Sequence, residues 1–245
     1  MKIPMRTYKV KDIREHFISE LNAEKFTVDK TGQKTIELLG ASFIADEPAI
    51  FGSPVNEYIE KEFSWYRSMS TNIKDIYGSD RKPPAAWEYA ANAHGEINSN
   101  YGLLIWSEKY FNQFDRVVQE LDKNPDGRRA TMVYNRPSIW AEYNENGKSD
   151  FICTNAVSYY IRDNKLNAVV QMRSNDVVFG YKNDYAWQRE VMILLIDRYL
   201  DLNIFSDLEL GDIYWQVQNL HVYERHFDLV KGKFKISMYM NDTLI

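Results

Sequence analysis

One cysteine, Cys153, is the side chain of this sequence best suited to covalent chemistry. A lone cysteine among apolar neighbours is more often a small buried hydrophobic residue than a nucleophile. Other side chains with acid, base or anion-binding chemistry lie before and after it: Glu62, Arg173, Ser174, His221 and Tyr223. A thiol can also act with a histidine base, and the spacing of His94, His221 and His226 selects none of them for that role.

Glu62 lies in the apolar face of a helix predicted to begin at Ser53-Pro54. Its neighbours at helical spacing are mostly aromatic: Tyr58, Ile59, Trp65 and Tyr66. Burial of a carboxylate is costly unless it is hydrogen-bonded, and burial tends to raise its pKa. Two interpretations stay open, a general acid-base residue or a hydrogen-bonded structural carboxylate at the edge of the face.

Basic residues at two predicted turns could bind an anion. Lys30 lies in the polar turn 28–33, and Arg128-Arg129 follow the turn 124–127 at the start of a predicted strand. Arginine is well suited to phosphate because its planar guanidinium donates parallel hydrogen bonds. The ordinary alternatives are a plain hairpin turn at Lys30 and solvated surface charge at the arginine pair.

The composition excludes several classes of protein. With 30 Lys and Arg against 35 Asp and Glu, the net charge of −5 offers no general attraction for nucleic acid. One cysteine cannot form an internal disulfide, the first residues lack the apolar run of a signal peptide, and no stretch approaches the ~20 apolar residues of a membrane span. We therefore expect a soluble, intracellular protein with no membrane or nucleic-acid partner. The Cys and His spacing matches no zinc motif, and no glycine-rich phosphate loop occurs, so no metal is expected.

These side chains must be positioned by both helices and strands. Hydrophobic periodicity predicts helices over 10–26, 53–66, 107–121 and 185–199, and strands over 36–40, 132–134, 152–161, 166–172 and 213–223. No linker or repeat divides the chain, which predicts one domain over residues 1–245. We expect an α+β fold with one large, mostly antiparallel or mixed sheet flanked by helices. Neighbouring strands of this sheet would carry Cys153, the Arg173-Ser174 pair and the His221 to Tyr223 pair.

Several blocks, taken in order, resemble the thymidylate synthase superfamily nearly end to end. They are Lys30 to Gly32, Glu62 to Trp65, Trp87 to Gly102, Arg128-Arg129, Cys153, Arg173 to Asp176, Gly180, Asp184 and His221 to Tyr223. Three positions depart from the synthase pattern: Thr154 replaces a histidine, Ser158 a glutamine and Lys30 an arginine. Asp184 stands where synthases acting on deoxyuridylate carry asparagine. Together with the segments GEINSNYG and RSNDVVFG, it resembles the deoxycytidylate (dCMP) hydroxymethylase branch.

The resemblance implies a role for each matched residue. Cys153 would be the nucleophile that adds to C6 of the pyrimidine, and Glu62 would organise water and proton transfers, with Tyr101 and Asp176 nearby. Asp184 would read the base, and in its protonated form it would donate to N3. Without the resemblance, a helix-capping aspartate before Tyr185 would be the favoured interpretation of Asp184.

The resemblance also implies how ligands are bound. The 5′-phosphate would be held by Arg173 and Ser174, with Lys30 in the same site and Arg128 and Arg129 reaching in from a second subunit of a homodimer. His221 and Tyr223 would bind the sugar hydroxyl. The folate would be lined by Trp87, Asp176 and Gly180.

The implied reaction converts dCMP, 5,10-methylenetetrahydrofolate and water to 5-hydroxymethyl-dCMP and tetrahydrofolate. Such a product would feed modified-cytosine DNA in a virus, which would place the enzyme in the host cytoplasm, where other nucleotide-synthesis enzymes are further candidate partners. The alternatives are a thymidylate synthase, a CMP hydroxymethylase, or a non-catalytic binding or scaffold subunit of a nucleotide-synthesis complex.

Overall fold

A six-stranded sheet forms the centre of the computed structural model, which describes residues 7–28 and 32–232. The strands are β1 Thr27–Val28, β2 Lys34–Ile44, β3 Thr131–Val133, β4 Thr154–Arg162, β5 Lys165–Asp176 and β6 Glu209–Tyr223. Their order across the sheet is β1-β2-β6-β5-β4-β3. β5 and β6 are parallel, and the other neighbouring pairs are antiparallel. The predicted α+β fold with a mixed, mostly antiparallel sheet is therefore confirmed.

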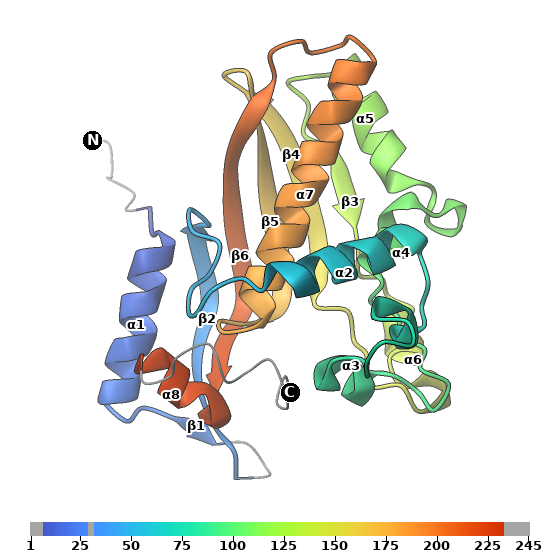
Figure 1. The fold of residues 1–245 in the computed structure, drawn as a ribbon. Helices are drawn as coiled ribbons and strands as arrows, with labels where there is room; N and C mark the ends of the chain where they lie inside the picture. Colours follow the sequence, from blue (N-terminus) through green and yellow to red (C-terminus); the bar gives the residue numbers. More distant parts are fainter. Residues whose placement is uncertain (1–6, 29–31, 233–245) are drawn as a thin grey trace, which may run out of the picture.

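Helices cover one face of this sheet, some in contact with its strands and some packed on other helices. They are α1 Val10–Asn22, α2 Asn56–Ser68, α3 Ala85–Ala90, α4 Tyr101–Trp106, α5 Gln113–Lys123, α6 Ile139–Glu142, α7 Gly180–Asp201 and α8 Phe227–Val230. Short 3-10 turns cover Ile73–Ile76, Glu108–Tyr110, Glu145–Gly147 and Glu224–His226. The long helix α7, orange in Figure 1, lies across β5 and β6. Its connection from β5 places the first turn of α7 beside the end of that strand.

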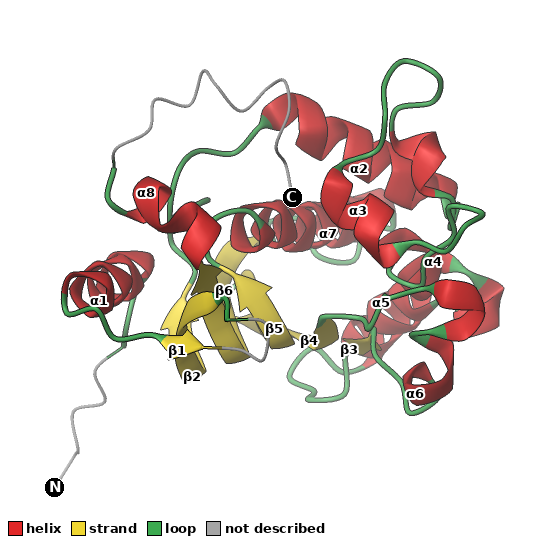
Figure 2. Cartoon of the chain, turned by 90° about the horizontal axis from the view of Figure 1, so that it is seen from below, coloured by secondary structure: helices red, strands yellow, loops and turns green. Residues whose placement is uncertain are grey.

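The opposite face of the sheet carries no helix of the described chain, as Figure 2 shows. The burial pattern of β6 reflects this difference: Ile213, Trp215 and Val217 are buried, while Tyr214 and Gln216 between them are exposed. Successive side chains of a strand point to opposite faces, so one face forms the core and the other is open. A shallow hollow on the open face is lined by residues of β2, β5 and β6.

Several predicted element boundaries were wrong in detail; the helix predicted over 10–26, for example, ends at Asn22. Helix α2 begins at Asn56 with Val55 at its N-cap, and not at Ser53-Pro54. The predicted helix from Ser107 is broken because Phe111 and Asn112 adopt positive φ values of 68° and 42°, and the Asn112 side chain then caps α5 by accepting from the Asp115 amide.

The helix predicted over 185–199 also begins earlier than expected, which excludes the alternative of a helix-capping role for Asp184. Helix α7 begins at Gly180, so Asp184 lies in its second turn and cannot cap its N-terminus. The predicted anion-binding residue Lys30 lies outside the described residues.

Candidate active site

The thiol of Cys153 lies directly before β4, against the neighbouring strand β5. The Arg173 amide on β5 donates to the Cys153 carbonyl at 2.9 Å, and the Arg173 guanidinium lies 3.5 Å from the Cys153 sulfur. The same guanidinium donates to the carbonyls of Ile152 and Phe151 and lies over the Phe151 ring. Arginine and thiol are thus held together by the backbone, as the prediction of neighbouring strands required.

In the single chain, the environment of Cys153 favours the neutral thiol over the thiolate. Burial raises the pKa of Cys153 to about 11, the Arg173 charge opposes this, and Asp184 and Asp150 reinforce it. Of the arginines that the resemblance assigns to the site, the described chain brings Arg173 to this cysteine, while Arg128 and Arg129 were expected from a second subunit. Activation of the thiol therefore needs additional positive charge near it, such as the approach of further cations.

Arg128 and Arg129 lie at the other end of β4. The carbonyl of Ala130, the next residue, accepts from the Tyr159 amide. Tyr159 is six residues along the chain from Cys153, which corresponds to ~20 Å at the rise of an extended strand. The Arg129 guanidinium pairs with Glu120 at 3.0 Å, and its side chain is 76% exposed. Within one chain these arginines cannot reach a phosphate bound beside the thiol.

Glu62 is buried among aromatic side chains, as its helical spacing predicted. It is 4% exposed, and the Tyr58 hydroxyl donates to its Oε1 at 2.5 Å. Trp87 in turn donates from Nε1 to the Tyr58 hydroxyl at 2.9 Å. Burial raises the pKa of Glu62 to about 7, although the hydrogen bonds from Tyr58, Trp87 and Tyr66 oppose the rise. A carboxyl with this pKa can take up and release protons near neutrality, so the geometry is compatible with the acid-base interpretation.

Asp184 is held by a second buried polar chain. The Asn175 side chain donates to its Oδ2 at 2.8 Å, and Trp215 donates to Asn175 Oδ1 at 3.3 Å. Burial raises the pKa of Asp184 to about 8, and the charge of Glu62 adds to the rise while the bond from Asn175 opposes it. At neutral pH the protonated form of Asp184 therefore dominates.

Asp176 and Gly180 shape the start of α7. One oxygen of Asp176 accepts from the amides of Val178 and Phe179 at 2.9 and 2.6 Å. The other oxygen lies 3.8 Å from His226 Nδ1, and neither atom has a hydrogen-bond partner in the described chain. Although burial opposes it, the nearby His226 and the Phe179 amide hold the pKa of Asp176 below its usual value. A Cβ at Gly180 would lie 3.1 Å from the Asn175 amide nitrogen, so glycine lets Asn175 approach the helix.

The remaining predicted site residues lie on the strands and helix around the thiol. His221 and Tyr223 share one face of β6 with their ring centroids 4.9 Å apart. Across the β5–β6 pairing, His221 is opposite Asp176, and Ser174 is opposite Asn219.

Tyr101 at the start of α4 accepts a hydrogen bond at 3.0 Å from Thr154, a residue that departs from the synthase pattern. Ser158, a second departure, is hydrogen-bonded to Thr131 of β3.

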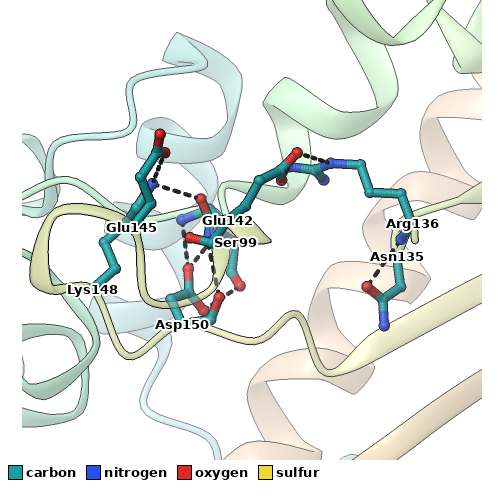
Figure 3. A network of polar contacts seen from close by, with 8 residues as sticks. Ser99, Asn135, Arg136, Glu142, Glu145, Lys148 and Asp150 are labelled. Carbon is teal, nitrogen blue, oxygen red and sulfur yellow. Dashed lines mark hydrogen bonds and ion pairs between the residues drawn. The ribbon is translucent and has the colours of Figure 1, made fainter. Parts of the chain in front are cut away.

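A polar network anchors the segment that leads into Cys153, and Figure 3 shows it. The Asp150 carboxylate accepts from the amides of Asn98 and Ser99 at 2.5 and 2.8 Å, and from the Ser99 hydroxyl at 2.6 Å. Lys148 donates to the Asn98 side chain at 3.0 Å. Because Asn98 and Ser99 directly precede α4, this network fixes Tyr101 and Cys153 relative to each other.

A mostly apolar pocket lies beside Trp87. Its lining includes Pro84, Trp87, Phe179 and the buried Lys182. The sequence pattern did not single out Tyr58, Asn175, Asp150 or Lys182. Only Tyr58 had a local signal, since it lies four residues before Glu62 on the same helix face; the others are placed by contacts between distant segments.

Two searches of residues 7–28 and 32–232 bear on other functions. They contain no group of three or more His, Cys, Asp or Glu side chains arranged to hold a metal ion. Over the same residues, each helix is too short or too polar to cross a membrane.

The chain belongs to the thymidylate synthase family, whose description matches residues 20–244. The solved structure of thermostable thymidylate synthase A from Bacillus subtilis has the same fold, with a TM-score of 0.65 at 17% identity over 92% of this chain and 83% of that one.

Among relatives, the chain is 53% identical to the deoxycytidylate 5-hydroxymethyltransferase of Enterobacteria phage T4, over 92% of this chain and 91% of the relative. Its counterpart from Enterobacteria phage T2 is also 53% identical, over 90% and 89%. The thymidylate synthase of Francisella philomiragia is more distant, at 24% identity over 82% and 76%.

Proposed function

We propose that this protein is a dCMP hydroxymethylase that converts dCMP, 5,10-methylenetetrahydrofolate and water to 5-hydroxymethyl-dCMP and tetrahydrofolate. The observation that carries the proposal is the 53% identity, over nine tenths of both chains, to the phage deoxycytidylate 5-hydroxymethyltransferases. The synthase relatives are much more distant, at 24% identity for the Francisella enzyme. Because the named relatives come from phages, we further propose that the protein acts in the cytoplasm of a host cell.

The covalent step is assigned to Cys153. Its sulfur bonds to C6 of the cytosine, and the electron pair released in the ring makes C5 a nucleophile toward the one-carbon unit of the folate. The raised pKa of the thiol means that the proton must leave before or during this step. Arg173, 3.5 Å from the sulfur, stabilises the thiolate and is also assigned to the substrate phosphate.

Asp184 is assigned to the base. Cytosine presents an acceptor at N3 beside a donor at N4, so a protonated carboxyl can donate to N3 and accept from N4. Negative charge accumulates at N3 as the thiolate adds to C6, and a proton donor there lowers the barrier. Support comes from the raised pKa of Asp184, about 8, and from Asn175, which orients its carboxyl group.

Glu62 is assigned to water and proton transfer. Once the tetrahydrofolate has left, an exocyclic methylene remains at C5, and water adds to it to give the hydroxymethyl group. Proton transfers in these steps need a group that exchanges protons near neutral pH, which the Glu62 pKa of about 7 allows. The Tyr58 hydroxyl, itself hydrogen-bonded by Trp87, holds the carboxyl in place. Tyr101 accepts a hydrogen bond from Thr154, the residue that follows Cys153.

The folate is assigned to the side of the site formed by Trp87, Asp176 and Gly180. Trp87 offers an aromatic face to the ring system of the folate, and the mostly apolar pocket that Trp87 also lines borders this side of the site. Asp176 Oδ2 is a buried acceptor without a partner in the described chain, so it can accept from a ring N–H. The sugar hydroxyl is assigned to His221 and Tyr223 on β6.

A second copy of the chain is assigned to the open face of the sheet. Arg128 and Arg129 lie ~20 Å along β4 from the thiol, so they can serve a phosphate only at the site of another subunit. In a two-fold dimer packed through the open face, each active site would receive Arg128 and Arg129 from the other subunit.

The test is mass spectrometry of the nucleotide after incubation with methylenetetrahydrofolate and either dCMP or dUMP. A hydroxymethylase adds one carbon and one oxygen to dCMP and produces no dihydrofolate absorbance. A methyl group on dUMP together with dihydrofolate absorbance would instead identify a thymidylate synthase. Parallel incubation with CMP separates the ribonucleotide enzyme, and absence of any product would favour a non-catalytic binding subunit.

A further inference from the structure

Lys182, in the first turn of α7, is a buried cation that no role above has used. It is 6% exposed, and its ammonium lies 4.5 Å from the centroid of the Phe179 ring. No carboxylate of residues 7–28 and 32–232 forms an ion pair with it. Burial lowers the pKa of Lys182 to about 8, and the charge of Asp176 opposes this. Burial of an unpaired cation is costly, so its retention suggests an anion that arrives with a ligand.

The pocket that Lys182 lines borders the hydrogen-bonded side chains that hold Glu62. Tyr58 donates to Glu62 on one side and accepts from Trp87 on the other, and both Tyr58 and Trp87 also line this pocket. Residues of a helix are about 100° apart around its axis, so Lys182 and Asp184 leave α7 from nearly opposite sides. If Asp184 faces the base, Lys182 faces away from it.

Only one end of the proposed cosubstrate matches this position. The one-carbon unit is carried on the pterin, which must lie beside the base at Cys153, and the anionic groups of the folate are the carboxylates of its glutamyl tail. The phosphate of dCMP is a separate anion, and Arg173 already lies beside the thiol to receive it. A lysine in a mostly apolar pocket next to Trp87 is therefore placed for the tail.

We propose that Lys182 binds a carboxylate of the glutamyl tail of the folate and makes the enzyme selective for folates that carry it. The proposal rests on the proposed function for the identity of the cosubstrate. It predicts that the ammonium contributes to folate binding and leaves the chemical step unchanged.

The experiment compares wild type with Lys182→Met, which keeps much of the side-chain length without the charge, and Lys182→Arg, which keeps the charge. Binding of tetrahydrofolate and of tetrahydropteroate, which lacks the glutamate, is measured by quenching of tryptophan fluorescence. We expect Lys182→Met to bind tetrahydrofolate roughly 10- to 100-fold more weakly, the range for a hydrogen bond to a charged group. Its binding of tetrahydropteroate should be unchanged, and Lys182→Arg should retain most of the selectivity.

Kinetics with the methylene forms of both compounds give a second measurement. For Lys182→Met, KM for the glutamyl folate should rise while kcat and KM for dCMP stay at wild-type values. Equal weakening of both folates would overturn the proposal in favour of a packing role, and a rise confined to the KM for dCMP would assign the ammonium to the phosphate. If Lys182→Met does not fold, as judged by circular dichroism, Lys182→Gln serves for the same comparison.

Failure of this inference can be told apart from failure of the proposed function. If wild type does not hydroxymethylate dCMP but Lys182→Met selectively loses affinity for tetrahydrofolate, the proposed reaction is wrong and the carboxylate site stands. If wild type makes 5-hydroxymethyl-dCMP and the selectivity for the glutamyl tail is the same in both proteins, the reaction stands and the Lys182 site is wrong.

Discussion

The two ends of β4 are built in opposite ways. At the Cys153 end, Arg173 is fixed by the carbonyls of Phe151 and Ile152, and Asp150, three residues before Cys153, is buried and hydrogen-bonded to Ser99. At the other end, Arg129 is held by one exposed ion pair to Glu120. A surface ion pair contributes little to stability, whereas buried polar groups must be satisfied. The difference indicates that the first end is organised within one chain, while the second is available to a partner.

The largest effect should come from removing the nucleophile, Cys153, at the first end of β4. Cys153→Ser should lower turnover of dCMP by at least about 10⁴-fold, because a serine hydroxyl is a far weaker nucleophile here. Binding of dCMP, measured by isothermal titration calorimetry, should stay close to wild type since the phosphate and sugar contacts lie elsewhere. Turnover near the wild-type rate would rule out the covalent mechanism.

The end of β4 beside Arg128 and Arg129 is tested by mixing subunits. The double variant Arg128→Ala/Arg129→Ala should lose on the order of 10³-fold in kcat/KM, because two charge-assisted phosphate contacts disappear. Mixed with Cys153→Ser, it should recover about a quarter of wild-type activity, since random exchange makes half the dimers mixed and each mixed dimer has one intact site of two.

Two controls accompany the mixing experiment. Subunit exchange is verified by differential labelling and native mass spectrometry, and each parent alone must stay near background. Proven exchange without recovered activity would show that the arginines serve their own chain or none.

Asp184 should show a smaller, substrate-dependent effect. Asp184→Asn should lower kcat/KM for dCMP on the order of 10²-fold, because the proton donor to N3 is lost. The amide can donate to O4 and accept from N3–H of uracil, so activity on dUMP should rise relative to dCMP. Parallel kinetics on both nucleotides provide the measurement. An unchanged preference would mean that Asp184 does not read the base.

The smallest effect concerns the pH dependence of stability. Because the folded-state pKa of Glu62 is raised from 4.5 to about 7, its protonated form stabilises the folded protein fully below about pH 4.5. That contribution is lost as the pH rises through about 7, with a slope of at most about 1.4 kcal/mol per pH unit. Glu62→Gln should therefore lose less free energy of unfolding than wild type between pH 5 and pH 8.

Urea titrations at the two pH values measure this difference. Glu120→Gln at the other end of the sheet is the matched control, because Glu120 pairs with Arg129 near the surface. It should leave the wild-type pH dependence unaltered. An identical pH dependence in wild type and Glu62→Gln would contradict a raised pKa at Glu62.

Much of the fold and part of the site could be predicted from periodicity and from the order of motifs. Cys153, Arg173 and His221 were expected on neighbouring strands: Arg173 and His221 lie on the neighbours β5 and β6, and Cys153 directly precedes β4, which pairs with β5. Helix ends were less predictable. The positive φ of Phe111 and Asn112 splits one expected helix, β5 continues to Asp176, and α7 begins at Gly180 instead of Tyr185.

What the sequence by itself determined is therefore local chemistry and family membership. The burial of Glu62 follows from the 3.6-residue period, since residues three and four apart share a helix face whatever the rest of the chain does. Only the tertiary structure decided that Asn175 holds Asp184, that Asp150 anchors the segment before Cys153, and that Lys182 is buried. It also decided that Arg128 and Arg129 lie a strand length from the thiol. These relations depend on strand register and helix packing between distant segments, and no spacing along the chain encodes them directly.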